Sequence, residues 1–270
     1  MPVLVTSAHR PLARRIARRL LEEGGEVRAY AHGDVASLRA AGAIVASGEV
    51  DDEGRLEAAM AQVHTVVHVG GGLLATAPHQ LERDAETVAV AAGNAGVQRL
   101  IGLSLPGASV DAPDPLRRAK GVVEARFAEA DPPSVMLRSS LVDTPALRDA
   151  LATAGLGPEV LEQTEVAPVR IEDLVELVAA FDQARSRSRR GHLVVAADGP
   201  TRMTLQAYLD RVGVTGPGGG GMVGRRLTDE LRAPLLRGAL TGGPWVTEDE
   251  AVVDGWGFAG LHPLAPTAAA

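Results

Sequence analysis

The feature that most constrains this 270-residue chain is the alternation of short apolar runs with amphipathic, helix-like segments. This alternation is typical of βαβ units, in which parallel strands form a sheet that helices cover on both faces. Strands are expected at residues 3–6, 27–31, 43–47, 65–69, 100–103, 135–138 and 192–196. The sequence therefore predicts an α/β fold with a doubly wound parallel sheet.

The helix-like segments follow the rules for helix ends and helix faces. Pro11 suits the first turn of a helix, where its missing N–H would have no partner. Apolar residues then recur at helical spacing, and arginines between positions 14 and 19 form the opposite face, which we interpret as solvated and balanced by Glu22 and Glu23. Further helices are expected over residues 81–95 and 116–130.

Composition excludes several functional classes. The net charge of −7 argues against general nucleic-acid binding, which needs a basic surface. The absence of cysteine excludes disulfides and thiolate chemistry, and none of the seven histidines shows metal-ligand spacing, so no metal is expected. No apolar run is long enough to span a membrane and no signal segment opens the chain, so a cytoplasmic protein with no membrane partner is expected.

Several segments match one protein family in the same order. Residues 63–71 form an apolar run that contains His68 and ends in Gly70 and Gly71, and residues 95–101 followed by Ser104 form the next run. These runs resemble the fourth and fifth strands of the extended and atypical short-chain dehydrogenase/reductases, which include NmrA-like and epimerase/dehydratase-like members. Later landmarks of the family match residues 134–138, 169–174 and 191–205.

The resemblance covers most of the chain and implies two regions with different structural roles. Residues 1–140 are expected to form a Rossmann-like core, and residues 141–270 to add the remaining core elements and a small substrate-capping lobe in one compact unit. Ligands of such sheets bind outside the carboxyl ends of the strands. We expect Trp245 and Trp256 to cap that crevice, with Trp245 in the substrate pocket.

The loop after the first strand departs from the family pattern. The family has Thr-Gly-Ala-Thr-Gly-x-x-Gly, whereas this chain has Thr-Ser-Ala-His-Arg-Pro-Leu-Ala at residues 6–13. Ala13 still permits close packing of helix on strand, but Ser7 is strained if its position requires a positive φ. Arg10 stands where the backbone should approach a diphosphate, so we expect it to fill that space. It either meets an anion at the helix N-terminus or, as is commoner for a lone loop arginine, points into solvent.

A second departure affects the catalytic residues. Reductases of the family carry Tyr-x-x-x-Lys, but here Leu116 precedes Lys120 by four residues, and leucine cannot exchange a proton. Ser104 stands in the region of the family's serine, without a second hydroxyl after it. We interpret Lys120 and Glu124 as an i,i+4 pair on a helix surface.

The cofactor-selecting position after the second strand contains His32 and Asp34. Asp34 either holds a ribose hydroxyl or caps the following helix. Gly70 and Gly71 complete the residues expected near a cofactor.

Other candidates for acid–base chemistry are His9 on the altered loop and Asp111 and Asp114 in the Pro-rich segment that follows the fifth strand. His9 is the first choice among the histidines. His68 is expected to be a hydrogen-bonded structural residue, and His79 to lie near the substrate.

Three function classes remain, in this order. The first is an enzyme that lost hydride transfer and performs a cofactor-free, non-redox acid–base reaction on a small hydrophobic metabolite, such as cyclisation, isomerisation, elimination or ring opening. The second is an atypical reductase or epimerase that uses NADP or NAD, and the third is a non-catalytic, NmrA-like ligand sensor. Frequent Ala, Arg and Gly are compatible with a GC-rich bacterial source and hence with bacterial specialised metabolism.

Overall fold

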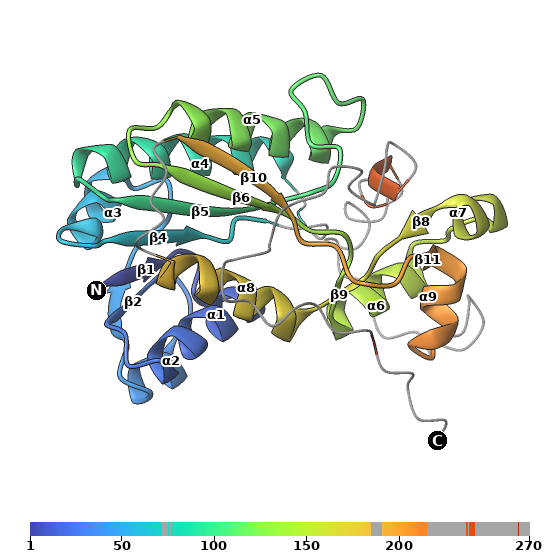
Figure 1. Ribbon diagram of the computed structural model, residues 1–270, viewed down its shortest axis with the longest axis horizontal. Helices are drawn as coiled ribbons and strands as arrows, with labels where there is room; N and C mark the ends of the chain where they lie inside the picture. The colour runs from blue at the N-terminus through green and yellow to red at the C-terminus, as the bar shows by residue number, and fades with distance from the viewer. Residues whose placement is uncertain are drawn as a thin grey trace.

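A seven-stranded parallel sheet forms the centre of the protein (Figure 1). The computed structural model describes residues 1–71, 75, 77–184, 191–214, 236, 238–240 and 264. The strand order is β10-β6-β5-β4-β1-β2-β3, and every pairing is parallel. The strands are β1 (Val3–Val5), β2 (Val27–Ala31), β3 (Ile44–Ser47), β4 (Thr65–His68), β5 (Arg99–Ser104), β6 (Ser134–Arg138) and β10 (His192–Ala196). The predicted doubly wound fold is confirmed, and each of these strands lies where an apolar run predicted it.

Helices cover both faces of the sheet (Figure 1). One face carries α3 (Glu53–Met60), α4 (Pro78–Asn94) and α5 (Pro115–Glu129), and the other carries α1 (Pro11–Glu22), α2 (Ala36–Ala40) and α8 (Ile171–Gln183). Alternate residues of a strand point to opposite faces, so Val66 and Val67 of β4 belong to different core clusters. The sheet is therefore buried on both sides, which explains its near-continuous apolar strands.

The polar face of α1 lies against α8. Arg15 pairs with Glu172 at 2.6 Å, and Arg19 pairs with both Glu176, at 2.5 Å, and Glu23. The interpretation of this face as balanced within its own helix was therefore incomplete, because α8 supplies two of the acids. The two pairs with α8 are partly solvent-exposed, so each contributes less than about 1 kcal/mol and mainly fixes how α8 sits on α1.

A smaller group of elements lies at one end of the sheet (Figure 1). It contains α6 (Pro145–Thr153), α7 (Pro158–Gln163) and α9 (Leu205–Arg211), together with four short strands. The strands β7 (Val142–Asp143) and β9 (Val169–Arg170) pair in parallel, and β8 (Glu165–Val166) pairs with β11 (Met203–Thr204) in antiparallel fashion. The chain returns from β9 to the core as α8 and β10, and then enters this group again as β11 and α9. Trp245 and Trp256 lie outside the described residues.

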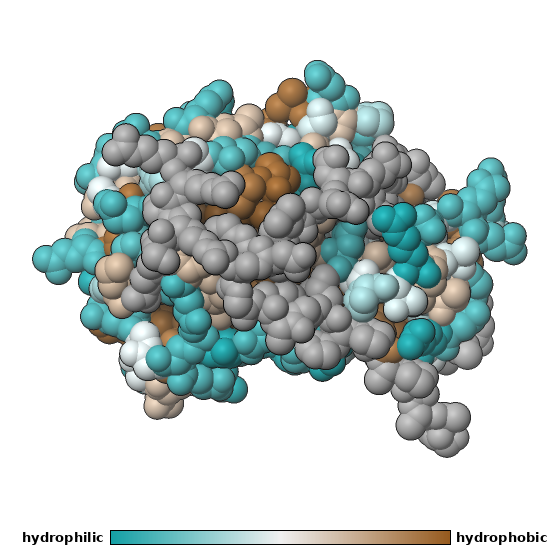
Figure 2. Space-filling view, in the orientation of Figure 1, coloured by the Kyte–Doolittle hydropathy of each residue, from teal (hydrophilic) through white to brown (hydrophobic). Residues whose placement is uncertain are grey.

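The outer strand β10 carries a partly exposed apolar surface. Figure 2 shows a hydrophobic patch over this strand, where Leu193 and Val194 are partly exposed. Within the part of the chain that the structure describes, no helix combines the length and the apolar character needed to cross a bilayer.

Candidate functional site

A cavity of about 560 Å³ lies outside the carboxyl ends of β4, β5 and β6. The N-termini of α1 and α8 form one side of it, and the segment from β7 into α6 forms the other. Because β1 and β4 are neighbours in the sheet, the cavity adjoins the switch point at which the strand order reverses, where doubly wound sheets bind their ligands. Apolar side chains make up most of its wall: Leu12, Val69, Leu103, Leu105, Val142, Leu147, Ile171 and Leu174.

Lys120 of α5 contributes a buried ammonium group to this wall. The residue is only 2% exposed, and its Nζ donates a hydrogen bond to the Leu103 carbonyl at 2.8 Å. Burial lowers the pKa of Lys120 from 10.5 to about 8, Glu124 opposes that shift, and the positive charge of Arg10 adds to it. The interpretation of Lys120 and Glu124 as a surface pair was wrong, because the Glu124 carboxylate is buried and accepts two hydrogen bonds from Arg138, at 2.9 and 2.6 Å.

Ser104 ends β5 at the same wall. The residue is 2% exposed, and its Oγ is buried without a hydrogen-bond partner among the described residues. A buried hydroxyl in this state costs about 1–3 kcal/mol, which a ligand oxygen in the cavity would offset. Leu116, at the position of the family's tyrosine, is buried in the apolar core and supplies no exchangeable proton.

His68 lies beneath the cavity and is held neutral. Its Nδ1 is 3.0 Å from the Thr6 Oγ1, in agreement with the predicted hydrogen-bonded structural role. Burial lowers the pKa of His68 to about 3, with smaller contributions from Lys120 and Arg10. Gly70 lies next to the His68 and Lys120 side chains and has a φ of +57. A Cβ at this position would lie 3.2 Å from the His68 Nε2 and 3.5 Å from the Lys120 Nζ. A side chain at position 70 would therefore crowd the His68 ring and would also be strained by the positive φ.

The altered loop forms a tight turn between β1 and α1. Ser7 adopts a φ of +52, so its position does require the left-handed region that glycine favours. The turn closes through a 2.8 Å hydrogen bond from the Arg10 N–H to the Ser7 carbonyl, and α1 begins at Pro11 without a side-chain cap. The Arg10 side chain does not simply point into solvent, because its Nη1 donates to the Gly70 carbonyl at 3.3 Å and the residue lines the cavity.

The predicted site residues divide between this cavity and its surroundings. The lining includes Arg10, Gly70, Gly71, Ser104 and Lys120. Ser7 and Ala13 are buried in the adjoining loop and helix, and His9, His32 and Asp34 gather at the end of β2.

The two loop aspartates and His79 lie elsewhere. Asp114 caps α5 by accepting the Arg117 N–H at 2.9 Å and pairs with its guanidinium at 3.0 Å, which gives the carboxylate a structural role. Asp111 is exposed, as is His79 in the first turn of α4. None of these three residues lines the cavity, and Trp245 lies outside the described residues.

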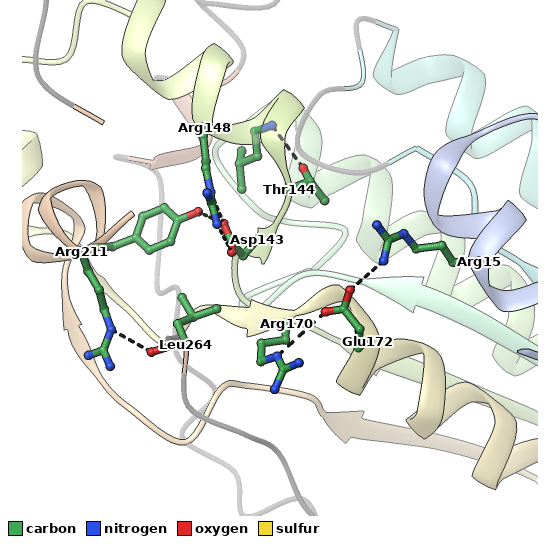
Figure 3. Close-up of polar contacts among 10 residues, drawn as sticks. Arg15, Asp143, Thr144, Arg148, Arg170, Glu172, Arg211 and Leu264 are labelled. Atoms are coloured by element: carbon green, nitrogen blue, oxygen red, sulfur yellow. Dashed lines mark hydrogen bonds and ion pairs between the residues drawn. The ribbon is translucent and has the colours of Figure 1, made fainter. Parts of the chain in front are cut away.

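Two features of the site were not predicted from the sequence. The first is Asp143 in the cavity wall, whose carboxylate accepts two hydrogen bonds from Arg148, at 2.7 and 2.6 Å, and one from Tyr208 at 2.7 Å (Figure 3). Burial acts to raise the pKa of Asp143, but the hydrogen bonds from Arg148 and Tyr208 together outweigh it and lower the pKa. No local pattern marks this aspartate, because its partners come from α6 and α9.

The second feature had a plain sequence signal. Lys120 is the only lysine in the chain, so of the 27 basic residues counted as Lys or Arg the other 26 are arginines. An ammonium can lose its proton when it is buried, whereas a guanidinium cannot under ordinary conditions. The single lysine of a chain that otherwise uses arginine is therefore a sequence signal that makes Lys120 a candidate for a titrating group.

A model of a known protein family matches residues 8–154, which is more than half of the chain and includes Arg10, Ser104 and Lys120. The chain belongs to the NAD(P)H-binding family. The resemblance to short-chain dehydrogenase/reductases of the NmrA-like and epimerase/dehydratase-like groups is confirmed.

Solved structures agree with this assignment at the level of the fold. The protein is similar to Citrobacter sp. triphenylmethane reductase complexed with NADP(H), with a TM-score of 0.75, 17% identity and coverage of 98% of this chain and 97% of that one. It is also similar to UDP-glucose-4-epimerase from Stenotrophomonas maltophila with bound NAD, with a TM-score of 0.63, 20% identity and coverage of 80% and 84%. No curated protein matches the chain at a significant level.

The expectation that the protein uses no cofactor was wrong. The matched family is NAD(P)H-binding, and the two similar structures hold NADP(H) and NAD. The expectation rested on Ser7, Arg10 and Leu116, which differ from the family pattern, and the family match shows that these differences do not remove the chain from an NAD(P)H-binding family. Among the described residues, no three His, Asp or Glu side chains gather closely enough to hold a metal ion.

Proposed function

We propose that the protein is an NAD(P)H-dependent reductase that acts on a small, largely apolar carbonyl compound, with Lys120 as the proton donor. The observation that carries the proposal is the buried Lys120 ammonium, which opens onto an apolar cavity at the carboxyl ends of β4 and β5 beside the unpartnered hydroxyl of Ser104. Family membership supplies the cofactor class.

The residues present fit a dinucleotide. The Ser7 turn and the uncapped N-terminus of α1 present backbone N–H groups where the helix dipole favours a diphosphate. Gly70 and Gly71 keep the end of β4 free of side chains, and a Cβ on Gly71 would already meet Leu81 at 2.6 Å. Arg10 spans the gap between this loop and Gly70, where its charge can pair with a phosphate oxygen.

Among the residues that line the cavity, Lys120 is the group best suited to exchange a proton near neutral pH. The hydrogen bonds from Arg148 and Tyr208 lower the pKa of Asp143, the carboxylate of this wall, and so hold it as an anion. The pKa of Lys120, about 8, lies close to the working pH, which is the condition for efficient acid–base catalysis.

The chemistry follows from these placements. A bound dihydronicotinamide supplies a hydride to the carbonyl carbon. The electron pair of the broken C=O π bond moves to oxygen, and that oxygen takes the proton of the Lys120 ammonium. Ser104 donates a hydrogen bond that orients the same oxygen, and the apolar wall excludes water. Lys120 then recovers its proton from solvent.

Calorimetric titration with NADPH and NADH, followed by turnover assays with small apolar ketones and aldehydes, tests the proposal. We expect Lys120→Met to lower kcat by roughly 10²–10⁴-fold with little change in cofactor Kd, and Lys120→Arg, which keeps the charge but cannot release the proton, to be equally impaired. Arg126→Met, an exposed change on the same helix, is the matched control. The wild-type kcat should fall as pH rises through about 8, because the protonated lysine is the active form.

Three results would count against the proposal. Absence of NAD(P)H binding at millimolar nucleotide, with the protein folded, would remove the reductase function. Full turnover by Lys120→Met would remove the lysine from the mechanism. Tight binding of NADPH or NADH without turnover of any carbonyl compound would favour a ligand sensor.

A further inference from the structure

The smaller group of elements contributes two polar side chains to the cavity wall that the proposed reaction does not use. Asp143 ends β7 and Thr144 precedes α6, and both residues line the cavity. Lys120 and Ser104, which act on the carbonyl group, come from α5 and β5 in the core. A substrate in this cavity can therefore contact a second set of polar groups besides those that act on its carbonyl.

The Asp143 carboxylate is held in place by partners from α6 and α9. Its Oδ1 accepts hydrogen bonds from the Arg148 Nε and the Tyr208 hydroxyl, both at 2.7 Å, and its Oδ2 accepts one from the Arg148 Nη2 at 2.6 Å (Figure 3). Neither partner lines the cavity. An ionised carboxylate has about four acceptor positions, so the hydrogen bonds within the described residues leave one position on Oδ2 for a donor from the cavity.

Thr144 places a hydrogen-bond donor next to this acceptor. Its Oγ1 accepts the Leu147 N–H at 3.2 Å as the N-cap of α6, and among the described residues no acceptor engages its hydroxyl proton. A ligand group that donates to Asp143 and accepts from Thr144 must do both at once. A hydroxyl group is the simplest group with that property, because an ammonium only donates and a carboxylate only accepts.

The charges of the wall also favour a neutral group. Asp143 is the only acid among the described residues that line the cavity, and Arg148 balances its charge. The cationic side chains of Arg10, Arg15 and Lys120 line the same cavity. A ligand ammonium would be repelled by these cations, and a ligand carboxylate would be repelled by Asp143 at close range. A neutral hydroxyl avoids both costs.

We infer that Asp143 and Thr144 bind a hydroxyl group of the substrate, so that the protein prefers hydroxylated carbonyl compounds to their deoxy counterparts. The inference rests on the proposed function and narrows its substrate class. The substrate is then an apolar skeleton with a ketone or aldehyde at one position and a hydroxyl group at another. Val142 and Leu147, which flank the pair in the wall, provide apolar surface for that skeleton. Asp143 and Thr144 determine specificity and take no part in the transfer of hydride or proton.

Steady-state kinetics with ketones that differ by one hydroxyl group test the inference. One matched pair is para-hydroxybenzylacetone with benzylacetone. The other is para-(hydroxymethyl)benzylacetone with para-methylbenzylacetone, which places the hydroxyl farther from the carbonyl. We expect kcat/KM of the wild-type protein to be about 10–100-fold higher for the hydroxylated member of at least one pair, mainly through a lower KM, because a hydrogen bond to a charged group is lost in the deoxy ketone.

Variants of the pair separate recognition of the hydroxyl from a purely structural role. Asp143→Ala should abolish the preference, and Asp143→Asn, which is closest in shape, should reduce it about fivefold or more by raising KM for the hydroxylated ketone. Thr144→Val should weaken the preference, whereas Thr144→Ser, which keeps the hydroxyl, should retain it. Asp149→Asn removes an exposed acid from the same helix and is the matched control. A role of Asp143 in stability alone would change the kinetics of both members of a pair equally.

Equal kcat/KM within both pairs, with benzylacetone reduced, would overturn the inference and leave the proposed function standing. An unchanged preference in folded Asp143→Ala or Asp143→Asn would also overturn it. A higher kcat/KM for para-(aminomethyl)benzylacetone, which is a cation at neutral pH, would overturn it in favour of an ammonium site. If no ketone is reduced, the proposed function fails, and calorimetric titration of the same pairs into the full-length protein decides the inference separately. Tighter binding of the hydroxylated member would then support the site, and equal binding would remove it.

Discussion

Replacing Lys120 by methionine should stabilise the protein at neutral pH, although the same change should abolish its chemistry. The perturbation removes an ammonium that is 2% exposed and lies against an apolar wall. The fall in the pKa of Lys120 from 10.5 to about 8 corresponds to a destabilisation of about 3 kcal/mol at pH 7, because one pKa unit is worth about 1.4 kcal/mol. Methionine has a similar length and no charge, but it leaves the Leu103 carbonyl without its hydrogen bond, at a cost of about 1 kcal/mol. The expected net gain is about 2 kcal/mol.

The stability gained from Lys120→Met should depend on pH. The folded protein holds the proton on Lys120 less tightly than the unfolded chain does. The loss of folding free energy caused by the buried charge is therefore complete below pH 8. It disappears as the pH rises from 8 to 10.5, because above that range the lysine is neutral in the folded and in the unfolded protein. Between pH 7 and pH 9.5 the advantage of Lys120→Met should shrink by about 2 kcal/mol.

Urea unfolding of both proteins at the two pH values measures this difference. Arg126→Met on the exposed side of α5 is the matched control and should change stability by less than about 0.5 kcal/mol at either pH. A Lys120→Met protein that is less stable than wild type at pH 7, or whose advantage does not change with pH, would refute the argument. Since Lys120 is the only lysine, isotope-labelled lysine also gives one side-chain NMR signal whose titration should report a pKa near 8.

Two further predictions concern the same region. Ser7→Gly and Gln62→Gly should each stabilise the protein by about 1 kcal/mol in urea unfolding, because both residues have positive φ (52 and 62), but only Ser7→Gly should tighten NAD(P)H binding in calorimetry. Equal binding effects from the two variants would contradict the assignment of the loop. Because the pKa of His68 is about 3, lowering the pH from 7 to 5 should cost about 2 kcal/mol of unfolding free energy through this residue. His68→Asn should lose that part of the pH dependence, and an unchanged dependence would count against a neutral, buried His68.

The sequence predicted the core well because the signals for it are local. Each strand of the large sheet is a short apolar run, and each βα connection restricts the order of neighbouring strands. Pro11 marked the start of α1, as the rules for helix ends predict. These features depend on residues close together in the chain.

The site was harder to predict because it depends on where side chains of distant segments end up. Lys120 was interpreted as a surface residue since its helical spacing to Glu124 suited a salt bridge, and only the packing of α5 shows that both are buried. The binding of Asp143 by Tyr208 joins residues that are far apart in the sequence and belong to the smaller group of elements. The cofactor error had a different origin, because residue types at positions 7, 10 and 116 that differ from a family pattern do not by themselves show that a cofactor site is lost.

Three unfavourable features of this protein lie around one cavity, and their position points to the site independently of the family match. A buried lysine, an unpartnered serine hydroxyl at position 104 and a serine held at positive φ each reduce stability by about 1–3 kcal/mol, and two of the three line the cavity while Ser7 borders it. Gln62, also at positive φ, lies in an exposed turn, where an unfavourable backbone conformation is not tied to any cavity. Groups that lower the stability of the folded protein are retained at one place when ligand binding or chemistry requires them. Here they lie at the carboxyl ends of β4 and β5, where a ligand in the cavity would offset their cost in free energy.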